Sequence, residues 1–214
     1  MSKTVLITGA SRGIGRETAR IFAQNGYTLF LTCQNRIDLL RETAGELNDL
    51  FSVPCFPFVG DMGDESFVTD LFSEIRTRCG HLDVLINNAG ISHIGLLQDM
   101  SLAQWNQMLS TDLTSVFLTC RAAIPLMLSR HQGSIVNVSS VWGNVGASCE
   151  AAYSAAKSGV NGLTRALAKE LAPSQIRVNA AAFGAIETSM NQFLSPEEKE
   201  ALTAEIPAGR FGSA

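Results

Sequence analysis

Short apolar runs alternate with longer amphipathic runs along the chain as far as about residue 182. The apolar runs are rich in Val, Ile, Leu and Phe, and they are apolar throughout rather than alternating with polar residues. Such continuous runs are typical of parallel strands that are covered on both faces. They predict strands over residues 4–8, 27–33, 55–60, 82–87, 134–140 and 176–182.

The runs between these strands repeat apolar residues at helical spacing, and two of them end in Gly, which commonly follows a helix. Pro125 is expected to break the longest of them, because proline lacks the N–H group that a helix interior requires. We predict helices over residues 13–26, 36–50, 64–80, 102–130 and 150–171.

Strand and helix follow one another repeatedly, which predicts a Rossmann-like, doubly wound α/β fold with helices on both faces of a parallel sheet. The chain has 214 residues, of which 46% are hydrophobic, so it is long enough to bury a sizeable core. No linker, repeat or low-complexity segment divides it. We therefore predict a single domain over residues 1–214.

Composition and charge limit the kinds of partner and the cellular location that we expect. The net charge of −4 does not favour a nucleic acid or an anionic membrane surface. No apolar run approaches the roughly 20 residues of a membrane span, and the first residues do not resemble a signal peptide, so a cytoplasmic location is expected. The cysteines are scattered without a CxxC pair, which predicts reduced, packed thiols rather than disulfides or a metal site. They are Cys33, Cys55, Cys79, Cys120 and Cys149.

A glycine-rich loop, TGASRGIG at residues 8–15, connects the first predicted strand to the first predicted helix. Gly9 permits a tight turn, while Gly13 and Gly15 allow close approach of the backbone to a phosphate and of the helix to the sheet. The free amides at the start of that helix would bind a pyrophosphate. A purely structural turn is the alternative, but the context between strand and helix favours a dinucleotide site.

The spacing TGxxxGxG differs from the common GxGxxG pattern and resembles the short-chain dehydrogenase/reductase family. Further matches are Asp61 at the end of the third strand, NNAG at residues 87–90, and Ser140 thirteen positions before Tyr153, with Lys157 four positions later. The resemblance extends from Thr4 to the last residue, and it is strongest to the 3-oxoacyl-[acyl-carrier-protein] reductases.

The resemblance implies roles for particular residues. Tyr153 would donate a proton to a carbonyl oxygen as hydride arrives, Ser140 would polarise that carbonyl, and Lys157 would hold the nicotinamide ribose. The implied cofactor contacts are Gly9, Ser11, Arg12, Gly13, Ile14, Gly15, Gln34, Asp61, Met62, Asn88, Tyr153, Lys157, Ile186 and Thr188.

Tyr153 and Lys157 lie one helical turn apart, so they share a helix face. At ~4 Å and an effective dielectric of about 20, an ammonium attracts a phenolate by roughly 4 kcal/mol. We therefore predict that Lys157 lowers the pKa of Tyr153 from its usual value toward the working pH. The alternative for a lone YxxxK is a core tyrosine beside a snorkelling lysine.

The end of the second strand, TCQNR at residues 32–36, carries no acidic residue. NAD-dependent enzymes commonly place an acid there to bind the ribose 2′-hydroxyl, and that acid would repel a 2′-phosphate. Arg12 and Arg36 are candidates to bind the 2′-phosphate, with Gln34 and Asn35 as hydrogen-bonding partners. NADP is thus favoured over NAD, although Arg36 as a plain solvated residue at a helix start is an equal alternative.

The chain departs from the family pattern at two site positions. Asp112 occupies the position of an asparagine whose backbone carbonyl, in the family, helps to hold a water that links the lysine to solvent. A buried carboxylate near Lys157 would stabilise the ammonium and alter the proton relay, so retained but altered activity is expected. Phe183-Gly184 replaces Pro-Gly beside the nicotinamide, which would leave the turn freer and add an apolar surface.

Family members continue beyond the equivalent of Ala214 through another helix and an edge strand, so we expect a further C-terminal segment in the natural protein. The resemblance also implies a homo-oligomer, often a tetramer. The substrate would be bound by residues 91–100, 143–149 and 191–207, the last of these being a predicted mobile flap. Arg130 and His131 would dock an acidic carrier protein or, more simply, form a solvated helix end.

These features predict an NADP-dependent enzyme that reduces a ketone to a secondary alcohol, with a 3-oxoacyl thioester as one candidate substrate. Sugar-nucleotide epimerases and dehydratases also use Tyr-x-x-x-Lys, but they carry a differently spaced glycine loop and a C-terminal substrate domain. A non-catalytic dinucleotide sensor is a third alternative, and it would have no need of Ser140, Tyr153 and Lys157 together.

Overall fold

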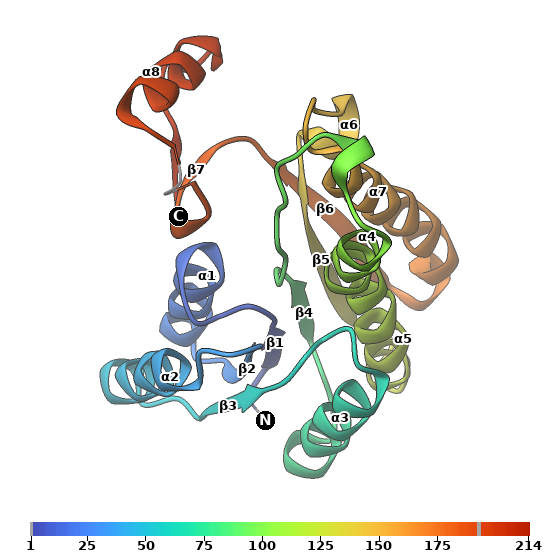
Figure 1. Ribbon diagram of the computed structural model, residues 1–214. Coiled ribbons are helices and arrows are strands. Elements are labelled where there is room, and N and C mark those ends of the chain that lie inside the picture. The colour runs from blue at the N-terminus through green and yellow to red at the C-terminus, as the bar shows by residue number, and fades with distance from the viewer. Residues whose placement is uncertain (1, 192–193) are drawn as a thin grey trace.

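The computed structural model describes residues 2–191 and 194–214. Within this part of the chain, six parallel strands form the central sheet (Figure 1). They are β1 (Thr4–Ile7), β2 (Thr28–Cys33), β3 (Cys55–Val59), β4 (Val84–Asn87), β5 (Gly133–Ser140) and β6 (Ile176–Phe183). The spatial order is β3-β2-β1-β4-β5-β6, with β1 paired to both β2 and β4. Every predicted strand is present, with bounds within about two residues of those expected.

Helices cover both faces of the sheet, as predicted for a doubly wound fold (Figure 1). Two helices lie on one face, α1 and α2, and three long ones lie on the other, α3, α5 and α7. The helix bounds are α1 (Gly13–Gln24), α2 (Ile37–Phe51), α3 (Glu65–Cys79), α4 (Leu102–Leu109), α5 (Ser115–Leu128), α6 (Trp142–Val145), α7 (Ala151–Leu171) and α8 (Pro196–Glu205).

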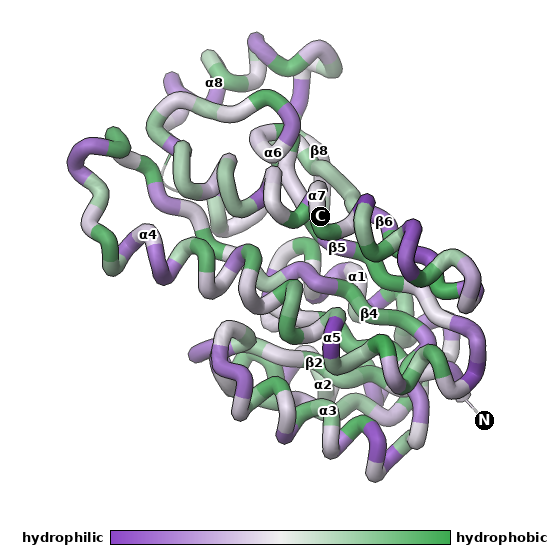
Figure 2. The backbone as a smooth tube through the Cα atoms, turned by 90° about the vertical axis from the view of Figure 1, so that its right-hand side faces the viewer, coloured by the Kyte–Doolittle hydropathy of each residue, from purple (hydrophilic) through white to green (hydrophobic). Residues whose placement is uncertain are grey.

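Successive side chains of the central strands supply two separate cores. Leu6 and Phe30 belong to the core beneath α3 and α5, whereas Val5 and Ile7 belong to the core beneath α1 and α2. All four side chains are completely buried. Both faces of each strand must therefore be apolar, which explains the continuous runs in the sequence and the hydrophobic strands at the centre of Figure 2.

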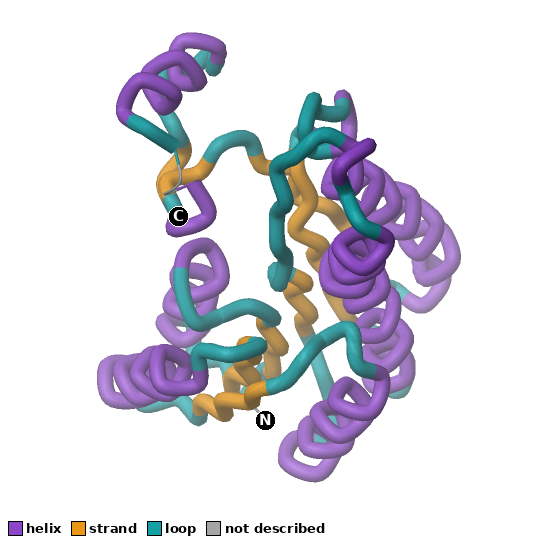
Figure 3. Tube along the Cα trace, in the orientation of Figure 1, coloured by secondary structure: helices purple, strands orange, loops and turns teal. Residues whose placement is uncertain are grey.

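The order of the strands reverses between β1 and β4, whose connections run to opposite faces of the sheet. Loops from the carboxyl ends of the strands meet at this point (Figure 3). In open parallel sheets, this is where ligands bind. The topology thus brings together motifs that lie far apart in the sequence.

The long helical region contains an interruption, but not where it was predicted. Pro125 lies inside α5 without breaking it, so that prediction is wrong. The helix persists because Leu126 and Met127, next to the proline, are buried in the core, and this packing offsets one lost backbone hydrogen bond. The interruption is instead a π-helical turn, Ser110–Thr114, between α4 and α5. Such turns are frequent at functional sites, and this one carries Asp112.

The run Leu102–Leu128 is long and apolar enough to cross a membrane by length and composition, which qualifies the expectation that no such run exists. Half of its most apolar stretch is buried inside the protein. A core helix of a protein that does not span a membrane can be equally long and apolar. The α5 part of this run is such a helix, because it packs on the sheet.

The last part of the described chain projects away from the sheet (Figure 1). Two short strands, β7 (Ile186–Glu187) and β8 (Gly212–Ser213), pair in parallel, and α8 lies between them in sequence. A reciprocal capping box between Ser195 and Glu198 starts α8. The predicted flap, residues 191–207, includes residues 192–193, which lie outside the described residues, and its mobility stays a prediction.

Thiols do not form disulfides in the described part of the chain, where all five cysteines are free. Cys33 and Cys120 are buried as expected, whereas Cys55, Cys79 and Cys149 are only partly buried. Burial raises the pKa of Cys55 to about 11 and that of Cys120 to about 12, so neither is ionised near neutral pH.

Candidate active site

A cavity of about 430 Å³ lies at the carboxyl ends of the strands. Its walls come from the loops that follow β1, β2, β3, β4, β5 and β6, together with α7 and the π-helical turn. Every residue predicted to act in catalysis or to bind the cofactor lines this one cavity. These are Gly9, Ser11, Arg12, Gly13, Ile14, Gly15, Gln34, Asp61, Met62, Asn88, Asp112, Ser140, Tyr153, Lys157, Ile186 and Thr188.

The glycine loop requires glycine for two different reasons. Gly9 has φ of 67°, in the left-handed region that side chains rarely adopt. A Cβ atom at Gly15 would lie 2.3 Å from the carbonyl oxygen of Gly9, so no side chain fits there. The loop leads into α1, whose N-cap residue Arg12 is extended and makes no side-chain capping bond. The first amides of α1 are therefore available to an anion such as a pyrophosphate.

Hydrogen bonds join the glycine loop to the loop after β4. Thr8 Oγ1 accepts from the backbone amides of Asn88 and Ala89, both at 2.9 Å. The Asn88 side chain donates back to the carbonyls of Thr8 at 2.9 Å and Gly9 at 3.1 Å. These bonds fix the two loops relative to each other and so shape the cradle that would hold a dinucleotide.

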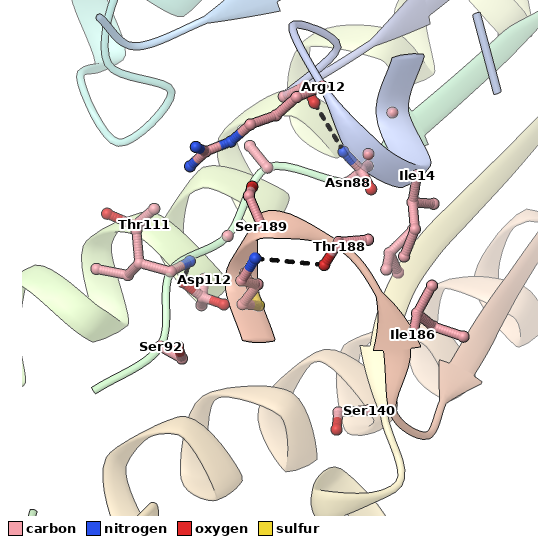
Figure 4. A pocket seen from close by; sticks show the side chains of 18 of the residues that line it. Arg12, Ile14, Asn88, Ser92, Thr111, Asp112, Ser140, Ile186, Thr188 and Ser189 are labelled. Carbon is pink, nitrogen blue, oxygen red and sulfur yellow. Dashed lines mark hydrogen bonds between the residues drawn. The ribbon is translucent and has the colours of Figure 1, made fainter. Parts of the chain in front are cut away.

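The far end of the cavity carries the residues expected to bind the adenosine. Asp61 Oδ1 accepts from the amide of Gly63 at 2.8 Å, which holds the turn after β3. Gln34 and Arg36 follow β2 and line the same end, and Arg12 extends from the glycine loop (Figure 4). Neither arginine forms an ion pair within the described chain. Both are exposed and therefore positioned to meet a phosphate.

Ser140, Tyr153 and Lys157 meet at the centre of the cavity. Ser140 ends β5, and its hydroxyl oxygen accepts from the amide of Trp142 at 3.2 Å. Lys157 Nζ donates to the carbonyl of Val138 at 3.1 Å and lies 5.5 Å from the centre of the Tyr153 ring. Ser139 also lines the cavity, but its hydroxyl donates to the backbone carbonyl of Lys157 at 3.4 Å. The geometry therefore favours Ser140 over Ser139 as the group that meets a carbonyl.

Asp112 is the departure from the family pattern that alters the site most. Its side chain is fully buried, and Oδ2 lies 3.1 Å from Lys157 Nζ. Oδ1 accepts from the amide of Ile91 at 2.8 Å, whereas Oδ2 has no aligned hydrogen bond within the described residues. A Cβ atom at Gly90 would approach Oδ2 to 2.8 Å, so only glycine leaves room for the carboxylate. The predicted proximity of a buried carboxylate to Lys157 is present.

Lys157 lowers the pKa of Tyr153 as predicted, but the predicted net shift toward the working pH is wrong, because the pKa of Tyr153 is raised overall. Burial raises the pKa of Tyr153, and the negative charge of Asp112 adds to this, while Lys157 and Ser140 oppose it without reversing it. Burial likewise raises the pKa of Asp112, against the opposing effect of Lys157. Lys157 thus interacts with the Asp112 carboxylate as well as with Tyr153, which weakens its effect on the pKa of Tyr153. Tyr153 keeps its proton at neutral pH and is ready to donate it.

The substrate end of the cavity contains two residues that the sequence did not point out, Trp142 and Glu150. Glu150 precedes Tyr153 by about one helical turn, so helical spacing alone could have predicted that the two side chains lie close together. Phe183 lines the cavity as well, and its carbonyl accepts from the amide of Val141 at 2.9 Å. This bond anchors the residue that replaces the family's proline, although a freer turn was expected.

Arg130 lies at the opposite end of β4, where it approaches Asp83 Oδ1 to 3.2 Å. Neither Arg130 nor His131 lines the cavity. The pair with Asp83 agrees with a structural role for Arg130, and the docking of a carrier protein by Arg130 and His131 stays a prediction.

A dinucleotide cradle beside a serine, a tyrosine and a lysine, at the switch point of a Rossmann-like sheet, defines an oxidoreductase that uses a nicotinamide dinucleotide. The model of the family described as short chain dehydrogenase matches residues 3–199. The chain belongs to this family, and the expected resemblance is confirmed.

Relatives place the chain within the family. It is 42% identical over 215 residues to the 3-oxoacyl-[acyl-carrier-protein] reductase of Bos taurus, covering 100% of this chain and 87% of the relative. It is 40% identical over 211 residues to the oxidoreductase YmfI of Bacillus subtilis, covering 99% of this chain and 86% of the relative. Within the family, the chain is most like the 3-oxoacyl-[acyl-carrier-protein] reductases.

Solved structures share the fold throughout. A 3-oxoacyl-[acyl-carrier protein] reductase from Brucella melitensis superposes with a TM-score of 0.91 at 35% identity, covering 99% of this chain and 80% of that chain. A candidate NAD(P)-dependent gluconate 5-dehydrogenase from Beutenbergia cavernae, with NADP bound at low occupancy, gives 0.92 at 33% identity, covering 99% and 84%.

Proposed function

We propose that this protein reduces a ketone to a secondary alcohol with NADPH, using Tyr153 as the proton donor. The observation that carries the proposal is the meeting of Ser140, Tyr153 and Lys157 in a cavity that also contains the dinucleotide cradle. The raised pKa of Tyr153 supports the direction of the reaction, because a protonated phenol suits reduction rather than alcohol oxidation.

The residues would act together on one carbonyl group. The glycine loop would hold NADPH, which when bound would supply the hydride for the carbonyl carbon. The Ser140 hydroxyl donates a hydrogen bond to the carbonyl oxygen, which favours the negative charge that develops there. Tyr153 then transfers its proton to that oxygen, and the positive charge of Lys157 stabilises the phenolate that remains. Lys157 is held for this role by Asp112 and by the carbonyl of Val138.

A 3-oxoacyl thioester is the substrate class that we favour. Ile94 and Met190 line the cavity while 51% and 43% of their surfaces are exposed, which gives the mouth an apolar rim suited to an acyl chain. The names of relatives such as the Bos taurus reductase point the same way. We further propose that the protein works in the cytoplasm as a homo-oligomer, and exposed apolar side chains on α4 and α5, such as Leu102 and Phe117, support this assembly.

The test of this function is the oxidation of NADPH followed at 25 °C with acetoacetyl thioesters and a panel of ketones. Consumption that depends on the ketone, with a 3-hydroxy product, is the expected result. A protein that binds NADPH but consumes none with any carbonyl would overturn the proposal and favour a dinucleotide sensor. Turnover of a sugar nucleotide without net consumption of cofactor would instead favour an epimerase.

NADP specificity gives a further prediction. Arg36→Ala is expected to lower kcat/KM for NADPH relative to NADH by about tenfold, because it removes a charge-assisted contact to the 2′-phosphate. Arg41→Ala is the matched control, since Arg41 lies on the same helix and does not line the cavity. An unchanged cofactor ratio in Arg36→Ala would show that Arg36 is only a solvated residue.

A further inference from the structure

Glu150 is a carboxylate at the substrate end of the cavity to which the proposed mechanism gives no role. It lies at the N-terminal boundary of α7, and its side chain makes no capping bond to that helix. It lines the cavity with Trp142. Burial raises the pKa of Glu150, and a hydrogen bond from the Trp142 indole opposes this shift without reversing it. Its carboxylate is half-buried and shares the cavity wall with Tyr153, whose pKa its negative charge helps to raise.

The backbone around Glu150 is fixed from two sides. Cys149, just before it, has φ of 62°, an uncommon conformation for a residue with a side chain. The carbonyl of Cys149 accepts from the amide of Gly95 at 2.8 Å, and Ser154 Oγ accepts from the amide of Ala147 at 3.1 Å. The segment is thus joined both to the loop after β4 and to α7. These contacts hold the backbone of Glu150 in place at the cavity wall.

The charges that line the cavity are segregated along its length. Its cationic side chains, among the described residues, are Arg12, Arg36 and Lys157. The two arginines lie at the adenosine end, and Lys157 is paired with Asp112. No cation within 4 Å balances Glu150 in the described part of the chain. A substrate therefore meets a net negative charge beside the reacting carbonyl.

We propose that Glu150 is a specificity-determining residue that selects uncharged carbonyl substrates and rejects those with an anionic group next to the carbonyl. Uncharged 3-oxo thioesters, esters and amides would be accepted, whereas free 3-oxo acids would be repelled. The physical basis is like-charge repulsion in a partly desolvated site, where it is screened less than in water. This inference rests on the proposed function, whose substrate class it narrows.

Two substrates of nearly equal shape test the proposal. Acetoacetamide is neutral and acetoacetate is anionic, so the ratio of their kcat/KM values with NADPH at pH 8 measures discrimination by charge. Because both react by the same chemical step, changes in proton donation by Tyr153 cancel in this ratio. We expect the wild-type protein to prefer the amide, and Glu150→Gln to reduce that preference on the order of tenfold.

Glu74→Gln is the control, because it removes the same charge from an exposed ion pair with Arg78 on α3. Its substrate ratio should equal that of the wild type. If Glu150 served only to stabilise the start of α7, Glu150→Gln would lower the melting temperature and leave the ratio unchanged, and that result would overturn the proposal.

A binding measurement separates failure of this inference from failure of the proposed function. The dissociation constants of acetoacetate and acetoacetamide are measured on the protein saturated with NADP⁺, where no turnover is needed. A charge preference that Glu150→Gln removes would support the inference even if no ketone were reduced. Equal affinities for the two compounds in the wild-type protein would overturn it even if reduction were fast.

Discussion

Tyr153→Phe is expected to lower kcat for ketone reduction by about 10²–10⁴-fold, while the affinity for NADPH falls by about tenfold at most, the effect of one lost hydrogen bond. The substitution removes one oxygen atom and keeps the ring, so the shape of the cavity is preserved. What is lost is the proton donor, and the Ser140 hydroxyl cannot replace it because an aliphatic hydroxyl is a much weaker acid than a phenol. Measurement of kcat with saturating NADPH, together with NADPH binding by fluorescence, checks both parts.

The other tyrosine of the chain offers a matched control. Tyr27 also has a lysine near its ring, with Lys3 Nζ 5.8 Å from the ring centre, and it packs edge-on against Phe22 at 4.9 Å. It lies outside the cavity. Tyr27→Phe should therefore leave kcat at the wild-type value. Equal rates in Tyr153→Phe and the wild type would rule out the assigned mechanism, because then the phenol would not be the acid.

The fold was predictable because its main signals are local. Leu6 and Ile7 are neighbours in the sequence and are buried on opposite faces of the sheet. A run of such residues is typical of a parallel sheet that is covered on both sides. The assembly of the site followed from topology, since the loop at Gly9, the Asn88 loop and Ser140 all follow strands that run in the same direction. Motifs at the ends of such strands must come together.

What the sequence could not predict depends on burial and on contacts between distant segments. Whether Pro125 breaks a helix depends on how well its neighbours pack, and a propensity contains no such information. The sign of the shift in the pKa of Tyr153 needed two quantities that spacing does not provide: how deeply the phenol is buried, and how close Asp112 lies. The role of Glu150 likewise depends on which other charges share its cavity.

Asp112→Asn is expected to lower the free energy of unfolding by about 3 kcal/mol, because it leaves the buried ammonium of Lys157 without a counter-charge. The side chains of Asp and Asn have the same shape, and an amide oxygen can still accept from the amide of Ile91, so the loss reports the charge. Urea unfolding of the single variants and of the pair Asp112→Asn with Lys157→Met measures the coupling.

The double variant is the decisive member of this set. Lys157→Met alone leaves Asp112 buried and unpaired, whereas the double variant buries neither charge. We therefore expect the double variant to be more stable than the sum of the two single losses implies, by an amount that approaches one of them. Additive losses would show that the 3.1 Å approach contributes no net interaction.

The same Asp112→Asn variant should change the pH dependence of the reverse reaction. Oxidation of the alcohol requires the Tyr153 phenolate as base, so its rate rises with pH as the phenol loses its proton. The charge of Asp112 raises the pKa of Tyr153, and its removal lowers that pKa. The rising limb of kcat/KM for alcohol oxidation should therefore move to lower pH, while reduction at neutral pH keeps its protonated donor. Asp70→Asn, at an exposed position of α3, should not move this limb. An identical profile in Asp112→Asn and the wild type would mean that Asp112 acts on Lys157 alone and not on the proton donor.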